Sequence, residues 1–285
     1  MQTQIAAFHP KKIHTSKVIL WIVICVIVVL WAIPFIFMIL TSLKSNADVS
    51  GAPPFALPTT LNWANYLNAV ARVNLLRAIK NSIIIAVIKV PLGLLISAMA
   101  AYAITRLKVP FPRGILIIFV LGTLVPIQVA LGTLFEIINK LGLLSTQLGI
   151  ILPYIAFGIP YEVLILYGFF EAIPKEMDEA ARIDGASNFR IFWSIILPLA
   201  KPALAALFIL DFVATWNEFS MALVILQRQE SWTVPLTLQG FNSAFQTFYG
   251  PLNAAIIISI LPVVIIYLLF QRYFVEGMYA GAVKG

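Results

Sequence analysis

The sequence predicts an all-α, polytopic membrane protein with six transmembrane helices. Hydrophobic residues make up 61% of the 285 residues, and the mean hydropathy is +0.97. Charged residues make up 11% of the chain, less than half of the roughly 25% that is usual in soluble domains. The apolar residues lie in long continuous runs, which favours helices over the ~10-residue alternating strands of a membrane β-barrel. This composition excludes a water-soluble domain and a disordered chain.

Each expected span is a run of about 20 apolar residues, the length that crosses a ~30 Å hydrocarbon core as a helix. The first run, 18–40, is too long for the apolar segment of a signal peptide, and no small-residue cleavage site follows it. We therefore expect it to be retained. The expected spans are 18–40, 82–103, 114–134, 148–170, 203–226 and 254–274.

The basic residues indicate that both chain ends face the cytoplasm. With the N-terminus inside, twelve Lys and Arg residues lie in inner segments and six in outer segments, while Lys89 falls within a span. Positive charge accumulates on the cytoplasmic side of membrane proteins, so the net charge of +7 is explained by topology rather than by nucleic acid. The expected organisation is a cytoplasmic leader (1–17), a transmembrane domain (18–274) with an outer loop (41–81) and an inner loop (171–202), and a cytoplasmic tail (275–285).

The outer loop 41–81 divides into two parts. Its first part contains Gly51, Pro53 and Pro54 and favours extended backbone. The stretch 63–80 that follows predicts a short amphipathic helix lying on the outer face.

The inner loop 171–202 is charged and yet strongly helix-forming. Pro174 suits the first turn of a helix, and the acidic residues after it complement the positive end of the helix dipole. Gly185 can adopt a positive φ and end that helix, and Ser187 or Asn188 can cap the next one. Apolar residues then recur at helical spacing, and two prolines before the fifth span are expected to kink the chain.

This pattern predicts two short helices joined by a glycine turn at the inner surface. A small charged projection of this kind fits a groove on another protein. It equally fits a pair of helices that rests on lipid headgroups, and these physical features alone leave both interpretations open.

A longer pattern in the same loop resembles the signature of binding-protein-dependent ABC importer permeases. It reads Glu179-Ala180-Ala181, three residues, Gly185, nine residues, Ile195, one residue and Leu197-Pro198, and every defined position is met. Other stretches resemble the carbohydrate-uptake branch of that family, and within it the maltose-transporter (MalG-type) subunit. They are Asn81-Ser82, Ala100-Ala101-Tyr102-Ala103, Leu141-Gly142-Leu143, Leu152-Pro153-Tyr154, Trp216-Asn217-Glu218 and Gly281-Ala282-Val283-Lys284-Gly285.

The resemblance implies the ABC importer permease fold and a permease subunit of an ATP-driven, binding-protein-dependent sugar importer in a bacterial inner membrane. The implied partners are a second permease in a heterodimer, two copies of a cytoplasmic ABC ATPase, an extracytoplasmic solute-binding protein and the sugar. The tail residues Gly281 and Lys284 are expected to contact the ATPase. The residues expected to couple the permease to an ATPase are Glu179, Ala180, Ala181, Asp184 and Gly185.

The sequence shows no nucleophile–base pair and no metal-ligand cluster, so we expect the chain not to be an enzyme. Cys25 is the single cysteine and lies in an apolar run, and the two histidines, His9 and His14, lie in the leader. A metal site and a cofactor site are therefore not expected. The sequence has no G-x-x-x-x-G-K-[ST] phosphate-binding loop, so ATP and Mg²⁺ are expected on the partner subunits.

Four ionisable residues lie within the expected spans: Lys89, Glu162, Asp211 and Glu218. Each one needs a partner or water, because a charge at the centre of a span costs at least ~2.5 kcal/mol on insertion scales. Counting helical rise from the outer span ends places Lys89 at a depth of ~10 Å, Glu218 at ~12 Å and Asp211 at ~22 Å. We therefore expect Lys89 and Glu218 to face the same polar cavity and to pair.

The substrate pathway is expected to include Lys89, Asp211, Trp216, Asn217 and Glu218. Purely structural roles for these residues are the alternative, since aromatic residues in spans usually pack and buried charges usually pair.

Two other classes of transporter remain open at this stage. An ABC permease for a non-sugar solute fits the inner-loop pattern alone, although the wider resemblance opposes it. An ion-coupled secondary transporter fits the intramembrane charges, but it has no need for a loop that docks an ATPase. The sequence does not identify the sugar.

Overall fold

The computed structural model describes residues 15–242 and 247–282, and the side chains of residues 17–242 and 247–272. Apart from turns and one isolated bridge between Asn242 and Thr247, the regular structure of these residues is helical. The helices are α1 (Thr15–Ser42), α2 (Asn46–Gly51), α3 (Ala64–Arg72), α4 (Leu75–Arg106), α5 (Pro112–Thr123), α6 (Ile127–Lys140), α7 (Gln147–Glu171), α8 (Glu176–Ile183), α9 (Asn188–Ile191), the π turn η1 (Phe192–Ile196), α10 (Leu197–Leu199), α11 (Lys201–Asn217), α12 (Ser220–Ile225), the 3₁₀ turn η2 (Gln229–Ser231), α13 (Val234–Leu238), the 3₁₀ turn η3 (Gln239–Phe241) and α14 (Tyr249–Ala282).

Within the described residues, four helices are individually long and apolar enough to cross a membrane. They are α1, α4, α7 and α14, and they confirm the predicted spans 18–40, 82–103, 148–170 and 254–274. Two bent pairs of helices bring the number of spans to as many as six when each pair is counted as one span. One pair is α5 with α6, bent by 94°, and the other is Asn188–Leu199 with α11, bent by 74°.

The expected third span, 114–134, is a bent pair of helices rather than one continuous helix. α5 ends at Thr123 and α6 begins at Ile127, and Pro126 between them is extended, with φ −66° and ψ 128°. Proline lacks the N–H that would continue a helix, and it disfavours helical backbone in the residue before it. The break therefore falls where the sequence has its proline.

The expectation of a continuous fifth span over 203–226 is wrong. α11 ends at Asn217, Glu218 is extended, and the separate helix α12 follows. The backbone N–H groups of Met221 and Ala222 donate to the Glu218 carboxylate at 2.8 Å and 3.1 Å. Glu218 thus satisfies N–H groups at the start of α12, which lack partners within their own helix.

The predicted outer helix 63–80 is two elements in the structure. Asn74 adopts a left-handed conformation with φ 50°, which separates α3 from the first turns of α4. Asn tolerates this conformation better than most residues. The Asn65 side chain of α3 donates to the backbone oxygens of Ser42 and Lys44 at 2.9 Å each, and so holds the end of α1.

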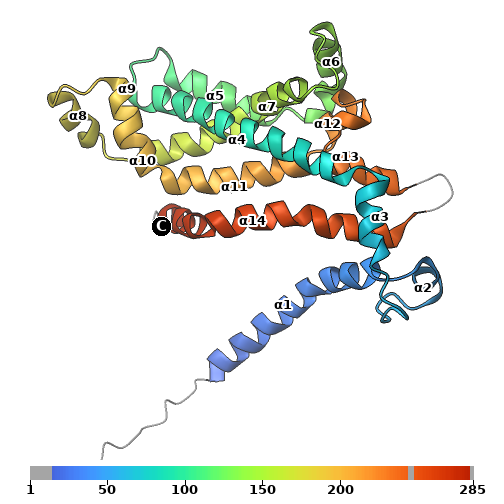
Figure 1. Ribbon diagram of the computed structural model, residues 1–285. Coiled ribbons are helices and arrows are strands. Elements are labelled where there is room, and N and C mark those ends of the chain that lie inside the picture. The colour runs from blue at the N-terminus through green and yellow to red at the C-terminus, as the bar shows by residue number, and fades with distance from the viewer. Residues whose placement is uncertain (1–14, 243–246, 283–285) are drawn as a thin grey trace, which may run out of the picture.

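Figure 1 shows α4, α7 and α11 lying along one another, with α14 beside α11 and α1 running away from them. No residue in the most apolar 18-residue stretch of α1 is buried, whereas 44% of the corresponding stretches of α4 and α7 is buried. The outward side chains of α1 must therefore meet lipid or another subunit. α8 and α9 project from the end of the bundle opposite α3 (Figure 1).

The main apolar core lies between α4, α7 and α11 and continues into the second half of the inner loop. Small residues on α4, among them Ala86, Ala98 and Ala101, are fully buried there. Small side chains let membrane helices approach closely, which strengthens their van der Waals packing. A second core cluster near α12 and the start of α7 closes the other end of the bundle.

Candidate functional site

The inner loop forms the predicted projection, which we define as residues 174–190. Its first helix, α8, is followed by Gly185 with φ +81°, and the Ser187 hydroxyl accepts from the Arg190 N–H at 3.3 Å to cap α9. The predicted glycine turn and cap are confirmed. Ile183 at the tip is 87% exposed. The projection thus presents both apolar and charged groups outside the bundle.

The residues expected to couple to an ATPase lie together on this projection. Glu179, Ala180, Asp184 and Gly185 are exposed, and Ala181 is partly buried against the main core. A Cβ atom added at Gly185 would meet no atom of the chain within 4 Å, although the positive φ strains any larger residue. These positions are therefore free to be covered by a second protein.

One acidic residue of α8 departs from this pattern. Asp178 is 3% exposed, and its carboxylate forms an ion pair with Arg106 Nε at 3.2 Å. From the sequence, Asp178 is one of the acidic residues that complement the helix dipole, and Arg106 is one of the basic residues of the inner segments. Neither local pattern signals this pair, because its members are separated by a span, a turn and another span.

The second half of the inner loop is anchored to the bundle by aromatic contacts. The Tyr102 hydroxyl of α4 donates to the Asn188 backbone oxygen at 3.0 Å, and the Tyr102 ring lies 5.2 Å from that of Phe192. Phe192 and Ile196 are buried, whereas Phe189 is exposed. The predicted apolar face of this helix is therefore present, and it meets the main core.

Lys89 pairs with two acidic residues from other helices. Its ammonium group contacts the Asp211 carboxylate of α11 and lies 3.5 Å from Glu162 Oε1 of α7. Glu162 also accepts a hydrogen bond from the Ser97 hydroxyl at 2.7 Å. We call Lys89, Glu162, Asp211 and Ser97 the charge cluster. Lys89 and Glu162 are 2% and 1% exposed, so these side chains are shielded from solvent and find their polar partners within the cluster.

The expected pairing of Lys89 with Glu218 is wrong. The depth estimate for Asp211 assumed a fifth span that runs on to residue 226. Since α11 ends at Asn217, Asp211 lies only about 9 Å from its end at helical rise, close to the depth estimated for Lys89. Glu218 instead accepts a 2.5 Å hydrogen bond from the Tyr154 hydroxyl, besides its bonds to the start of α12.

The expectation that Lys89 and Glu218 face one cavity is confirmed. A hollow of about 170 Å³ is lined by the charged residues Lys89, Asp211 and Glu218, by Tyr154, and by apolar residues that include Phe157 and Met221. We call it the polar cavity. Gly158 lines it too, and a Cβ atom there would meet Lys89 Nζ at 2.8 Å. The sequence did not single out Gly158, Glu162 or Ser97 as parts of this site.

The two remaining pathway candidates lie elsewhere. Trp216 is buried in the main core, with its ring stacked 5.8 Å from that of Phe212. Asn217 ends α11 and is exposed, and neither residue lines the polar cavity. The expected tail contacts of Gly281 and Lys284 fall outside the residues whose side chains the structure describes. Among the described side chains, no three His, Cys, Asp or Glu residues group as metal ligands would.

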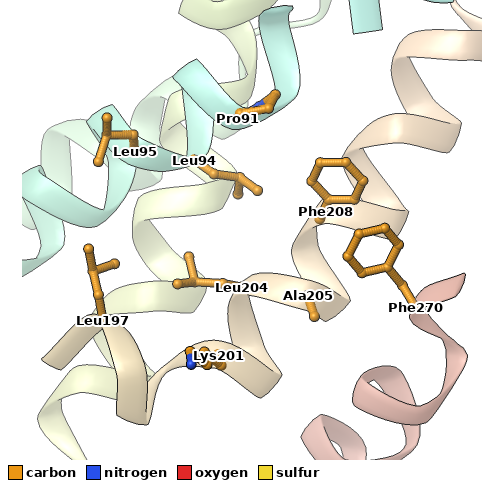
Figure 2. A pocket seen from close by; sticks show the side chains of 9 residues that line it. All are labelled: Pro91, Leu94, Leu95, Leu197, Lys201, Leu204, Ala205, Phe208 and Phe270. Atoms are coloured by element: carbon orange, nitrogen blue, oxygen red, sulfur yellow. The ribbon is translucent and has the colours of Figure 1, made fainter. Parts of the chain in front are cut away.

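A second hollow of about 490 Å³ is apolar (Figure 2). It lies between α4, the start of α11 and α14, and Lys201 is its one charged lining residue among Pro91, Leu94, Leu95, Leu197, Leu204, Ala205, Phe208 and Phe270. Sites for polar ligands place hydrogen-bonding groups around the ligand. The smaller polar cavity is therefore the better candidate for contact with a hydrophilic solute.

Comparison with known proteins gives a consistent match over almost the whole chain. The family model described as "Binding-protein-dependent transport system inner membrane component" matches residues 90–278. The chain is 38% identical to the trehalose/maltose transport system permease protein MalG of Thermococcus litoralis, over 95% of this chain and 98% of that protein. It is 36% identical to a probable starch degradation products permease, AmyC, of Thermoanaerobacterium thermosulfurigenes, over 96% and 99% of the two chains.

Two further similarities extend this match. The chain is 34% identical to the diacetylchitobiose uptake permease NgcG of Streptomyces coelicolor, over 91% of this chain and 84% of that protein. A chain of a bacterial ABC transporter involved in the import of the acidic polysaccharide alginate superposes with a TM-score of 0.77 at 25% identity, over 94% of this chain and 100% of that chain.

Proposed function

Because this chain belongs to the family of binding-protein-dependent transport system inner membrane components, we propose that it is a permease subunit of an ATP-driven sugar importer. It is a multi-pass protein of the inner membrane. Three similar proteins are named for the transport of trehalose and maltose, starch degradation products and diacetylchitobiose. These solutes are all carbohydrates, which supports a mono- or oligosaccharide as the substrate.

The observation that carries the proposal is the projection. Its motif residues Glu179 and Ala180 are exposed on the short helix α8, and Gly185 is exposed in the turn after it, outside the bundle. An isolated helix of eight residues is not stable by propensity alone. A groove on an ATPase subunit would bury this surface, and closure of the ATPases would then displace α8.

The proposed assembly has this chain beside a second, different permease. Two ATPase subunits would bind on the side of the projection, which makes that side and both termini cytoplasmic. ATP and Mg²⁺ would be held by those subunits, and a solute-binding protein would dock on the opposite face near α2 and α3. A ligand can shift the inward- and outward-facing states only through unequal affinity for them. Nucleotide does so through the ATPases and the loaded binding protein does so from outside.

The polar cavity is the proposed point of contact with the sugar in this subunit. Asp211 and Glu218 supply carboxylates that accept hydrogen bonds from hydroxyl groups, and Tyr154 supplies an aromatic ring beside them. Trp216 is buried in the core and keeps the packing role in this proposal. The cavity holds about 170 Å³, below the ~300–1,000 Å³ of complete ligand sites, which supports a pathway completed by the second permease.

The test is reconstitution of the chain with its partner subunits in proteoliposomes. ATP-dependent uptake of labelled maltose, trehalose and diacetylchitobiose is measured with and without the binding protein. Uptake of at least one sugar that requires ATP supports the proposal. Uptake by this chain alone, driven by a proton gradient, would contradict it.

The variant Gly185→Trp should abolish that uptake. An indole at this position would fill the surface that faces the ATPase, and the positive φ would strain the turn. Uptake and copurification of the ATPase are measured together in membranes. Wild-type values for both would remove the projection from the mechanism.

A further inference from the structure

The helix α8 is held to its own subunit at one buried point. Asp178 is its single buried residue among those described, and the other residues of the helix are exposed or, for Ala181, partly buried. Any force applied to the exposed face of α8 must therefore pass through Asp178, through the packing of Ala181, or along the two chain connections. The ion pair of Asp178 with Arg106 is the polar part of this attachment.

Arg106 joins three helices at this point. It is the last residue of α4, and its Nη2 donates to the backbone oxygens of Phe170 at 2.8 Å and Ile173 at 2.6 Å. Those oxygens lie at and just beyond the end of α7, and the Phe170 oxygen also accepts from the Ile173 N–H at 3.1 Å. Since the guanidinium group is planar and rigid, movement of its carboxylate partner displaces all of these contacts together.

The helix α4 connects this junction to the charge cluster. Lys89 lies seventeen residues before Arg106 on the same helix, or about 25 Å at helical rise. Lys89 contacts Asp211 and Glu162 beside the polar cavity. Tyr102 of the same helix also bonds to the backbone of Asn188, so both halves of the projection are attached to α4.

We propose that the buried Arg106–Asp178 pair is the positioning junction that passes displacement of α8 to α4, and so to the charge cluster at the polar cavity. This inference rests on the proposed function, because it needs an ATPase subunit to move α8. Arg106 and Asp178 act through α4 and touch neither the solute nor the nucleotide. A shift of α4 along or about its axis would reposition Lys89 against Asp211 and Glu162.

The experiment replaces both members of the pair, Arg106→Met with Asp178→Leu. Removing one partner leaves an uncompensated buried charge and should lower stability, whereas replacing both with apolar residues of similar volume should largely restore it. The measurements are thermal unfolding of the purified complex, copurification of the ATPase, and sugar imported per ATP hydrolysed. The sugar is one that the wild-type complex imports from the tested set.

We expect the double variant to be more stable than either single variant and to retain the ATPase, while sugar imported per ATP falls about tenfold. A purely structural pair would recover transport together with stability, so that result overturns the proposal. Loss of the ATPase from the double variant would overturn it too, because the pair would then only hold α8 in place for docking. Arg113→Met, an exposed change outside the projection, is the matched control and should leave all three measurements unchanged.

The variant Arg106→Lys provides a second test that keeps the positive charge. One ammonium group cannot reproduce the forked contacts to Asp178 and to two carbonyl groups. Import per ATP should fall by less than in the double variant, and unchanged import would contradict the junction. If no ATPase copurifies with the wild-type chain, the proposed function is wrong. That result is distinguishable from failure of the junction, which shows only in the variants.

Discussion

The projection and the charge cluster both carry charged residues, but they are built in opposite ways. The motif residues of the projection are exposed and lie on short helices outside the bundle, apart from the partly buried Ala181. Lys89 and Glu162 of the charge cluster are almost fully buried and are bonded to one another across helices. The difference separates two uses of charged residues. Exposed charged groups can bind a second protein, whereas buried charged groups need partners of opposite charge within their own subunit.

This comparison predicts that some variants change mainly stability and others change mainly sugar uptake. Changes in the charge cluster should act on stability, because they leave buried charges without partners. Changes at the exposed residues of the projection, which exclude the buried Asp178, should act on uptake and leave stability almost unchanged, because surface substitutions usually stay within about 0.5 kcal/mol. A variant of either class that behaves like the other would break the comparison.

The largest effect on stability is expected for Lys89→Met. The change leaves the carboxylates of Glu162 and Asp211 without their cation, and breaking a buried pair costs about 3–5 kcal/mol. Unfolding in mixed detergent micelles measures the loss. Lys80→Met, an exposed change on the same helix, is the control and should lower stability by less than about 0.5 kcal/mol. Equal stability of the two variants would contradict the buried pairing.

A smaller loss is expected for Tyr154→Phe. The variant removes the hydroxyl that donates to Glu218, but Glu218 keeps its two bonds to the backbone of α12. A hydrogen bond to a charged group contributes about 1.5–3 kcal/mol, and we expect the lower end because the remaining bonds persist. The same unfolding measurement checks it. A loss as large as that of Lys89→Met would show that the polar cavity depends on Tyr154 as much as on the ion pairs, and would contradict this order.

The smallest effect on stability is expected for Glu179→Ala. The side chain is exposed on α8, so the free energy of unfolding should change by less than about 0.5 kcal/mol. Sugar uptake should nevertheless fall, because the variant alters the surface proposed to meet the ATPase. Uptake and unfolding are measured on the same preparation. Wild-type uptake would place Glu179 outside the coupling surface.

The same contrast explains how far the sequence could predict the molecule. The projection is encoded locally: the acidic first turn of α8, Gly185 and the Ser187 cap lie within a dozen or so residues and predict their own geometry. The runs of apolar residues likewise predict four spans directly, because length and composition decide them.

The charge cluster could not be predicted in the same way, because its partners come from three helices. Counting depth along an assumed straight helix paired Lys89 with Glu218, and the end of α11 at Asn217 overturned that count. The buried pair of Arg106 and Asp178 has no local signal either. Pro126 is different, because a proline inside an apolar run is by itself a local signal for a break in the third span.

The most direct test of the account places a photoreactive amino acid at Ile183, the 87% exposed residue at the tip of the projection. Irradiation of membranes that contain the assembled, transport-competent complex should produce a covalent adduct between this chain and the ATPase subunit. The same label at Leu121, exposed on α5 within a bent span, should give no such adduct. Labelling of lipid alone from Ile183, in a complex that still imports sugar, would contradict the central claim that the ATPase drives this subunit through the projection.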